Sequence, residues 1–343
     1  MNVACACLVL LICICFSSVS CRFSRSNQLK QRDAQPKCGV PAIAPDTSAI
    51  AEHTFMNEIA KTTFADRTSL IWNGQDAIAH SWPWQVCLSL GSENVTIMHT
   101  CGGSIIGPHH VVTAAHCLSI RLPRGIELDY SPMVQFGLHD TNDVDSSISD
   151  AVMRQPDKII VHERYVININ DGFLAYDIAL LVFDEPIEFN DKVQPICLPD
   201  APVIEGTRCF VTGWGRREND IFNMKFPLQQ TVVQLHDVMN CDYEGNGPEA
   251  QKRMEMACNN ATVLEWLNDS VLCSDRSKSV ACNGDSGGPV ACEQNGVWTL
   301  HGVVSYGQSE KDRHGCDQTI SMYNKVSNMV PWINEQIKLS SAD

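Results

Sequence analysis

Residues 281–290 read ACNGDSGGPV and set one serine, Ser286, between Gly-Asp and Gly-Gly-Pro. Glycine adopts backbone angles that other residues avoid, so a loop of this kind can turn two backbone N–H groups toward one point. A hydroxyl beside two convergent donors suits acyl transfer, which needs a nucleophile and a group that stabilises the oxyanion. A Ser-Gly-Gly turn alone is usually only a turn, so this chemistry also requires a base and a carboxylate that orients the base.

Candidates for both groups lie upstream of the serine. His116 stands in VTAAHC (112–117), between an apolar strand-like run and a cysteine. Asp177 stands in YDIALL (176–181), directly before another apolar run. Such an aspartate is often only a strand-end residue, but burying it is costly unless it is paired, and a histidine would supply the partner. The order His, Asp, Ser therefore predicts a nucleophilic triad.

From Trp82 onward, short β-rich runs alternate with clusters of turn residues. The runs are WQVCLSL, GSII, HVVTAA, KIIVHERY, IALLVF, RCFVTGW and VWTLHGVVSY. This spacing predicts an all-β barrel or sandwich. No long amphipathic helix is expected before the stretch Val326 to Leu339, where Val330, Ile333 and Ile337 share a helical face beside Trp332.

Composition and the N-terminal residues indicate the compartment. The chain of 343 residues has a formal net charge of −15, which argues against nucleic acid as a partner because a polyanion binder needs the opposite sign. Residues 1–20 form a short apolar run followed by small residues, the pattern of a secretory signal peptide, with cleavage before or after Cys21 left open. No later stretch is long and apolar enough to cross a bilayer. We therefore expect a secreted, extracellular protein with no membrane span.

Cysteines and sequons agree with secretion. Of 17 cysteines, twelve remain when the signal peptide and Cys21 are set aside, and this content suits an oxidising compartment. Three Asn-X-Ser/Thr sequons are candidate glycosylation sites, at Asn94, Asn260 and Asn268. Residues 21–70 are polar and hold one interior cysteine, Cys38, so we interpret them as a pro-segment that precedes a main domain over 71–343.

Taken together, TAAHC, DIALL and GDSGGP resemble the motifs of the trypsin-like serine proteases. SWPWQV, CGGSI, ICLPD, GWG and VSYG are similar to the same family in order and spacing, and the resemblance covers residues 71–343. It implies two six-stranded antiparallel β-barrels with a C-terminal α-helix, and a triad in the cleft between the barrels. It implies no cofactor and no metal, because the loop where calcium-binding relatives place acids reads GLHD (137–140). Three further histidines are expected to be ordinary surface or loop residues and not metal ligands. Those histidines are His109, His110 and His139.

The roles of the family carry over to the matching residues. His116 would take the proton of Ser286 and later give it to the leaving amine, and Asp177 would orient the imidazole. The N–H groups of Gly284 and Ser286 would form the oxyanion hole. The implied partners are polypeptide substrates, an activating protease and protein protease inhibitors.

The resemblance also implies disulfide pairs. These are Cys101–Cys117, Cys209–Cys292, Cys241–Cys273 and Cys282–Cys316, with Cys38–Cys197 tethering the pro-segment after cleavage. Cys87 and Cys258 have no standard partner, so a bridge between them and two separate thiols both remain open.

Activation in this family exposes a new amine that ion-pairs with the aspartate before the serine. The matching start here is Ile71, whose amine would pair with Asp285. Leu70 precedes it where a basic residue is usual, which implies an activator that cleaves after leucine. A cut after Arg67 would leave three residues in front of that amine.

The residues of the specificity pocket follow from the same resemblance. Val280, six residues before Ser286, falls at the pocket base, where enzymes that cut after Lys or Arg have an aspartate. Ser305, Gly307 and Ser321 would line the walls, with Ser321 replacing a usual glycine and narrowing the interior. An apolar, narrowed pocket predicts cleavage after Leu, Met or Phe, as in chymotrypsin- and elastase-like relatives, and with loose discrimination among them.

Three alternatives stay open. An apolar pocket would let the enzyme activate itself at Leu70. Against an apolar pocket, a shortened loop after Cys316 would bring Asp317 toward it and restore a preference for basic residues. The long segment between Cys241 and Cys273 is a tolerated surface insertion or a shield over the outer substrate subsites. The competing function for the whole chain is a catalytically silent or latent homologue that acts as a binding module.

Overall fold

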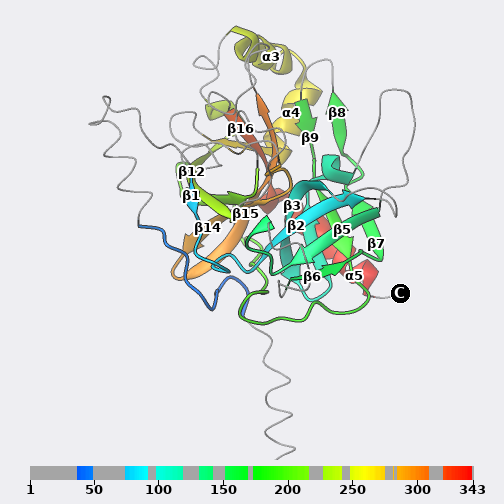
Figure 1. Cartoon of the computed structure of the whole chain (residues 1–343). Helices are drawn as coiled ribbons and strands as arrows, with labels where there is room; N and C mark the ends of the chain where they lie inside the picture. Colours follow the sequence, from blue (N-terminus) through cyan, green and yellow to red (C-terminus); the bar gives the residue numbers. More distant parts are fainter. Residues whose placement is uncertain are drawn as a thin grey trace, which may run out of the picture. The chain divides into compact units, whose positions relative to one another are not determined.

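The computed structural model describes residues 37–48, 74–91, 98–118, 131–141, 151–168, 173–215, 227–241, 248–274, 281, 284–308 and 320–341. The chain divides into two units, Met1–Lys37 and Cys38–Asp343. Lys37 alone represents the first unit among the described residues, so the fold is that of the second unit. Figure 1 shows the strands of this unit in two groups, which correspond to two sheets.

The first sheet has seven strands, and every neighbouring pair is antiparallel. In sheet order they are β6 (Val152–Arg154), β5 (Ser131–Phe136), β2 (Gln85–Gly91), β3 (Met98–Gly107), β4 (His110–Thr113), β10 (Ala179–Val182) and β7 (Lys158–Val161). Both β4 and β10 are buried along their whole length, and β10 is apolar throughout. The expectation that His110 is a surface or loop residue is wrong, because His110 begins β4 and is 5% exposed. A short 3₁₀ helix, η1 (Ala115–Leu118), follows β4.

The second sheet also has seven antiparallel strands. In order they are β1 (Gln75–Asp76), β12 (Gln229–Asp237), β11 (Arg208–Gly213), β14 (Pro289–Gln294), β15 (Val297–Gln308), β16 (Ile320–Lys325) and β13 (Val271–Ser274). Because β12 also pairs with β13, six of these strands close into a barrel. The predicted all-β fold is confirmed, with one difference of detail: among the described strands the first sheet has no pair that closes it.

The C-terminal helix is confirmed as α5 (Val326–Ser340). Its buried side chains are Val326, Met329, Trp332 and Ile333, whereas Val330 and Ile337, expected on the buried face, are only partly buried. The helix therefore packs through a face turned slightly from the one that the apolar spacing predicts.

Two helices that the sequence analysis did not predict lie between Cys241 and Cys273. They are α3 (Pro248–Cys258) and α4 (Ala261–Ser270), and they follow a short 3₁₀ helix, η3 (Val238–Asn240). The side chain of Asn260 caps α4 by accepting hydrogen bonds from the next backbone N–H groups. Helix α4 contacts β9 (Phe173–Ala175), which pairs with β8 (Val166–Asn168); Figure 1 shows α3 and α4 at the same end of the picture as this hairpin.

Aromatic side chains from both sheets share one core. The ring of Trp82 lies 5.8 Å from that of Trp84, 5.7 Å from Phe210 and 4.7 Å from Trp298. Phe210 belongs to β11 and Trp298 to β15, whereas the two other tryptophans lead into β2. Such edge and tilted ring contacts add to the burial of apolar area and fix one sheet against the other.

The described part of the predicted pro-segment is bound to the main fold. Cys38 is disulfide-bonded to Cys197, and the backbone of Gly39 exchanges hydrogen bonds of 2.8 Å with Pro195 and Trp298. Gly39 has a φ of +69°, and a Cβ atom there would lie 2.2 Å from the carbonyl oxygen of Trp298, so only glycine fits. Further along, the carbonyl of Asp46 accepts a hydrogen bond from the side chain of Gln230.

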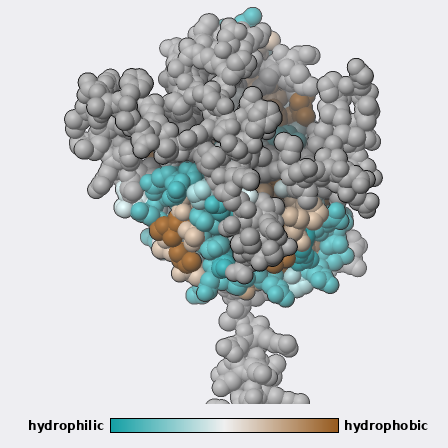
Figure 2. All heavy atoms as spheres, viewed as in Figure 1, coloured by the Kyte–Doolittle hydropathy of each residue, from teal (hydrophilic) through white to brown (hydrophobic). Residues whose placement is uncertain are grey.

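The described surface mixes polar and apolar side chains. On the face drawn in Figure 2 hydrophilic residues cover much of the described area, with apolar ones between them. The more exposed large apolar residues, such as Val152, Ile167 and Ile204, come from separate elements, as is usual for protein surfaces. None of the helices formed by the described residues is long and apolar enough to span a membrane.

Candidate active site

His116 and Asp177 meet at one end of the β4–β10 pair. Thr113, the last residue of β4, is opposite Ala179, the first residue of β10, so the residues that flank these strands come together. The Nδ1 atom of His116 lies 2.6 Å from Oδ2 of Asp177. The backbone N–H of His116 donates to Oδ1 of the same carboxylate at 2.7 Å. The aspartate thus holds both the ring and the backbone of the histidine.

Asp177 is 1% exposed, and polar partners offset the cost of burying its charge. The hydroxyl of Ser305 donates to Oδ2 at 2.5 Å. The side-chain amide of Asn324 donates to the backbone carbonyl of Asp177. Ser305, predicted as a pocket residue, therefore contacts the aspartate that orients the histidine.

The Ser286 turn requires its glycines. Gly284 and Gly287 have φ values of +103° and +77°, which side chains rarely adopt. The N–H of Gly288 donates to the carbonyl of Asp285 at 2.9 Å and closes the turn. The N–H of Ser286 has no backbone acceptor among the turn and loop hydrogen bonds of the described residues.

This turn packs directly against the strands that lead to His116. The N–H of Gly102, in β3, donates to the carbonyl of Ser286 at 2.7 Å. A Cβ atom on Gly287 would lie 2.3 Å from Oγ1 of Thr113, at the end of β4. The structure therefore brings all three predicted triad residues to one place, where the two sheets touch.

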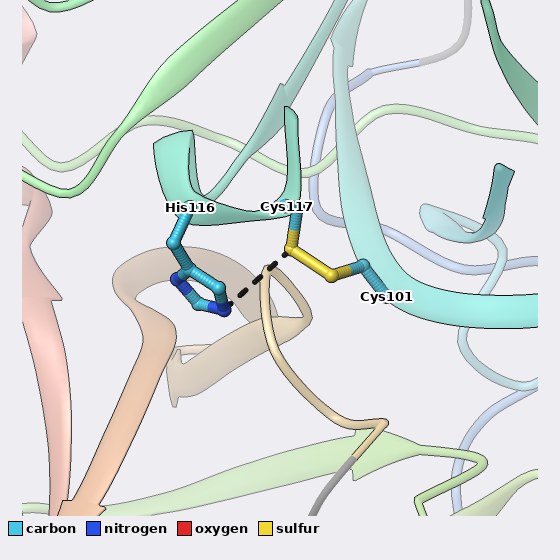
Figure 3. Close-up of side chains that lie close together, drawn as sticks. All are labelled: Cys101, His116 and Cys117. Atoms are coloured by element: carbon cyan, nitrogen blue, oxygen red, sulfur yellow. Dashed lines mark hydrogen bonds between the residues drawn. A yellow bond between two sulfur atoms is a disulfide. The ribbon is translucent and has the colours of Figure 1, made fainter. Parts of the chain in front are cut away.

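The other ring nitrogen of His116 faces a disulfide. Figure 3 shows Nε2 of His116 directed at the Cys101–Cys117 bridge, and it lies 3.9 Å from Sγ of Cys117. No hydrogen bond joins Nε2 to the hydroxyl of Ser286 in this structure; such bonds are often long before substrate binds. The three side chains lie close enough to hold a metal ion, but the bridge removes both thiolates as ligands.

Asp285 is fully buried next to the GWG motif (213–215). Its Oδ1 accepts a hydrogen bond of 2.8 Å from the N–H of Gly215. A Cβ atom on Gly213 would lie 2.1 Å from that oxygen, and one on Gly215 would lie 2.4 Å from Oδ2. The two glycines therefore make room for the carboxylate, a function that the motif alone did not reveal.

The predicted pocket residues lie on the paired strands β15 and β16. Gly307 and Ser321 are opposite each other in this pair, Gly307 exposed and Ser321 1% exposed. The hydroxyl of Ser321 accepts a hydrogen bond of 3.2 Å from the N–H of Ala281. Burial raises the pKa of the nearby Tyr323 phenol to about 12, so this phenol remains a donor, here to Ser274 at 3.0 Å.

Four of the five implied disulfides are formed by described residues: Cys38–Cys197, Cys101–Cys117, Cys209–Cys292 and Cys241–Cys273. Cys87 lies buried in β2, where burial raises the pKa of its thiol to about 12, whereas Cys258 is exposed at the end of α3. The two do not bridge to each other. Of the predicted glycosylation sites, Asn260 is exposed at the N-cap of α4 and Asn268 is exposed within α4.

Several predictions fall outside the described residues. They are the signal peptide 1–20, the cut between Leu70 and Ile71, the sequon at Asn94, the pocket base Val280, the pair Cys282–Cys316, and Asp317.

Comparison with known proteins establishes the family. A trypsin family model matches residues 71–333. The chain belongs to the trypsin family. This protease is 32% identical over 310 residues to chymotrypsin-C of Bos taurus, and the match covers 88% of the chain and 94% of the relative. It is 32% identical over 317 residues to chymotrypsin-C of Rattus norvegicus and 33% identical over 317 residues to that of Mus musculus, with the same coverage. The protease is accordingly a serine endopeptidase, and polypeptides are its substrates.

Proposed function

We propose that this protease is a secreted endopeptidase, made as a zymogen, that cleaves after apolar residues with the triad His116, Asp177 and Ser286. The observation that carries the proposal is the 2.6 Å contact between Nδ1 of His116 and Oδ2 of Asp177, beside the glycine-rich turn that holds Ser286. That contact leaves Nε2 of His116 as the ring atom able to exchange a proton with a nucleophile.

In the acylation step, the Ser286 hydroxyl attacks the scissile carbonyl carbon and its proton passes to Nε2 of His116. The carbonyl π electrons move to the oxygen, which accepts hydrogen bonds from the N–H groups of Gly284 and Ser286. Removal of one such donor typically costs about 3–4 kcal/mol of transition-state stabilisation. The imidazolium then gives its proton to the leaving amine as the C–N bond breaks. In deacylation, water attacks the ester, gives its proton to Nε2, and the Ser286 oxygen leaves and regains a proton.

Asp177 orients the histidine in this cycle. Its carboxylate accepts from the ring of His116 and from Ser305, so it holds the imidazole tautomer and stabilises the imidazolium. The buried position limits competition from water, which strengthens this pairing.

Apolar specificity is supported by Ser321 and by the sequence position of Val280, next to Ala281. Ser321 is buried and accepts a hydrogen bond from the backbone N–H of Ala281, which follows Val280 in the sequence; this supports the proposal that Ser321 and Val280 shape the same pocket. A hydroxymethyl group in place of a hydrogen atom leaves room for Leu, Met or Phe and reduces the depth available to longer side chains.

Zymogen activation is supported by Asp285. Its buried carboxylate accepts a hydrogen bond from the N–H of Gly215, and an α-amino group, with a pKa near about 8, would add a charged partner at neutral pH. We propose that a cut after Leu70 supplies this amine from Ile71. N-terminal sequencing of the active form should give Ile-Trp-Asn-Gly; a start at Thr68 would contradict this proposal. A Ser286→Ala zymogen mixed with active enzyme should also be cut there, and an uncut zymogen would exclude self-activation.

The function as a whole is tested by labelling with a serine-directed phosphonate probe. We expect the activated protein to become labelled at Ser286 and the uncut protein to be labelled far more slowly, because in this proposal the new amine pairs with Asp285 and holds the N–H groups of the turn in their productive position. The Ser286→Ala variant serves as the control for labelling elsewhere. An activated protein that takes up no label would favour a catalytically silent homologue and refute the proposal.

A further inference from the structure

Tyr176, the residue before Asp177, has an unusual backbone conformation. Its φ is +51°, and its side chain is 1% exposed. The other non-glycine residues with positive φ in the described part of the chain are a histidine and an asparagine, types that tolerate this region better than a bulky tyrosine. Such a conformation persists only when the surrounding structure holds it.

The side chain of Tyr176 is held on several sides. Its hydroxyl donates to Oδ2 of Asp269 at 2.7 Å. Its ring stacks on His162 with centroids 5.1 Å apart, and the guanidinium of Arg164 lies 4.2 Å from the ring centre. Burial, followed by the hydrogen bond to Asp269, raises the pKa of the Tyr176 phenol above its ordinary value. The phenol therefore stays protonated and donates.

Asp269 connects three elements. It lies in the last turn of α4, where the helix dipole disfavours an anion and where aspartate is a weak helix former. Its partners offset this cost: Nη1 of Arg164 lies 3.5 Å from Oδ2, and Asn328 of α5 donates to Oδ1 and to the backbone carbonyl. The carboxylate thus joins α4 and α5 to the chain segment that carries Asp177.

The backbone transmits the position of Tyr176 to Asp177. The N–H of Ile178 donates to the carbonyl of Tyr176 at 2.8 Å, which forms a tight turn with Asp177 at its centre. A rotation of Tyr176 therefore turns the Asp177 backbone, and with it the carboxylate that contacts Nδ1 of His116.

We propose that Asp269 is a positioning residue: through the Tyr176 hydroxyl it fixes the backbone that sets the Asp177 carboxylate against His116. The proposal rests on the triad of the proposed function. It gives the long segment between Cys241 and Cys273 a part in catalysis, in addition to any effect on the outer subsites. The other charged groups near Tyr176 and His162, namely Arg164, Glu163 and Glu265, are left unchanged in the test.

The test compares Tyr176→Phe, Asp269→Ala, the double variant and Asp269→Asn with the matched control Glu205→Ala. The carboxylate of Glu205 is 47% exposed against 42% for Asp269 and accepts a hydrogen bond from Asn240, but it has no contact with Tyr176. Both substitutions at Asp269 keep the Asn268 sequon. We would measure kcat and KM for a peptide substrate, the pH profile of kcat/KM, and the midpoint of thermal unfolding.

We expect Tyr176→Phe and Asp269→Ala each to lower kcat about tenfold, below the roughly hundredfold loss that a full ångström of misplacement can cause, with KM unchanged. The acid limb of the pH profile should move to lower pH, because a less well paired imidazolium gives up its proton more readily. The double variant should be no worse than either single one, and Asp269→Asn, which retains an acceptor oxygen, should recover most of kcat.

Values of kcat within twofold of the Glu205→Ala control, with an unmoved acid limb, would overturn the proposal. A double variant whose loss of kcat equals the product of the two single losses would also overturn the proposal. Ser286→Ala in the same assay separates the two claims. If it retains activity the proposed triad fails, whereas if it is inactive and Asp269→Ala behaves as the control does, only the positioning role fails. Should Asp269→Ala not fold, Tyr176→Phe and Asp269→Asn still decide the outcome.

Discussion

Replacing Gly213 by alanine should disturb the Ser286 turn through the neighbouring Asp285 carboxylate. The added Cβ atom would lie 2.1 Å from Oδ1 of Asp285, 2.9 Å from its Cγ and 3.3 Å from its Cβ. Ordinary contacts of a Cβ atom begin at 3.4 Å, so the carboxylate must move by about 1.3 Å. Because Asp285 directly precedes Ser286, this shift reaches the proposed nucleophile and the N–H groups proposed for the oxyanion hole.

The size of the effect follows from that displacement. A misplacement of about 1 Å can cost about a hundredfold in rate, so we expect kcat/KM to fall about a hundredfold. Overpacking a full core typically destabilises a protein by about 1–3 kcal/mol, and loss of the Gly215 N–H bond to the charged Asp285 adds about 1.5–3 kcal/mol. The loss of kcat/KM should therefore exceed any loss that comes from a smaller fraction of folded enzyme.

The assay measures kcat/KM on the activated enzyme together with urea denaturation. Gly107→Ala is the matched control, because a Cβ atom on Gly107 meets nothing within 4 Å. The control should keep both activity and stability. If Gly213→Ala retains kcat/KM within twofold of the parent, Asp285 does not couple the GWG motif to the active turn and the reasoning is refuted.

Three further predictions concern the pocket, the tether and pH. Ser321→Gly should raise the kcat/KM ratio of Phe to Leu substrates about tenfold, because the buried hydroxymethyl group narrows the pocket; an unchanged ratio in paired peptide assays would exclude Ser321 as a pocket wall. The double variant Cys38→Ser, Cys197→Ser should lose up to about 5 kcal/mol of unfolding free energy in urea, since the bridge closes a loop with a sequence separation of 159; unaltered denaturation curves would contradict this. Burial lowers the pKa of His110 to about 4 in the folded chain, whereas the unfolded chain binds this proton near pH 6.5. The free energy of unfolding should therefore fall as the pH drops from about 6.5 to about 4. His110→Asn should weaken that pH dependence in denaturation curves, and an identical dependence would show that His110 is not responsible.

Short motifs predict the local geometry of the candidate site where they carry strict backbone requirements. Gly287 has positive φ and also packs against Thr113, so the motif around Ser286 records two constraints at once. The aspartate before IALL could be recognised because a charge next to a buried strand needs a partner, and the structure supplies His116 and Ser305.

The sequence analysis did not predict the helices α3 and α4, although the sequence contains a helix-start signal for α4. Asn260 before Ala-Thr-Val is a typical N-cap, and Val263, Leu264 and Leu267 follow with helical spacing. The contact between Tyr176 and Asp269 could not be predicted, because it joins residues 93 positions apart and depends on a positive φ that no tyrosine reveals in sequence.

The most direct test of the triad compares Ser286→Ala, His116→Ala and the double variant on one peptide substrate. Residues that act as a unit lose nearly all of their effect with the first substitution. We predict that each single variant lowers kcat/KM by about 10⁴-fold or more and that the double variant is no slower than the slower single one. Losses that multiply in the double variant, or substantial turnover by Ser286→Ala, would contradict the proposed triad.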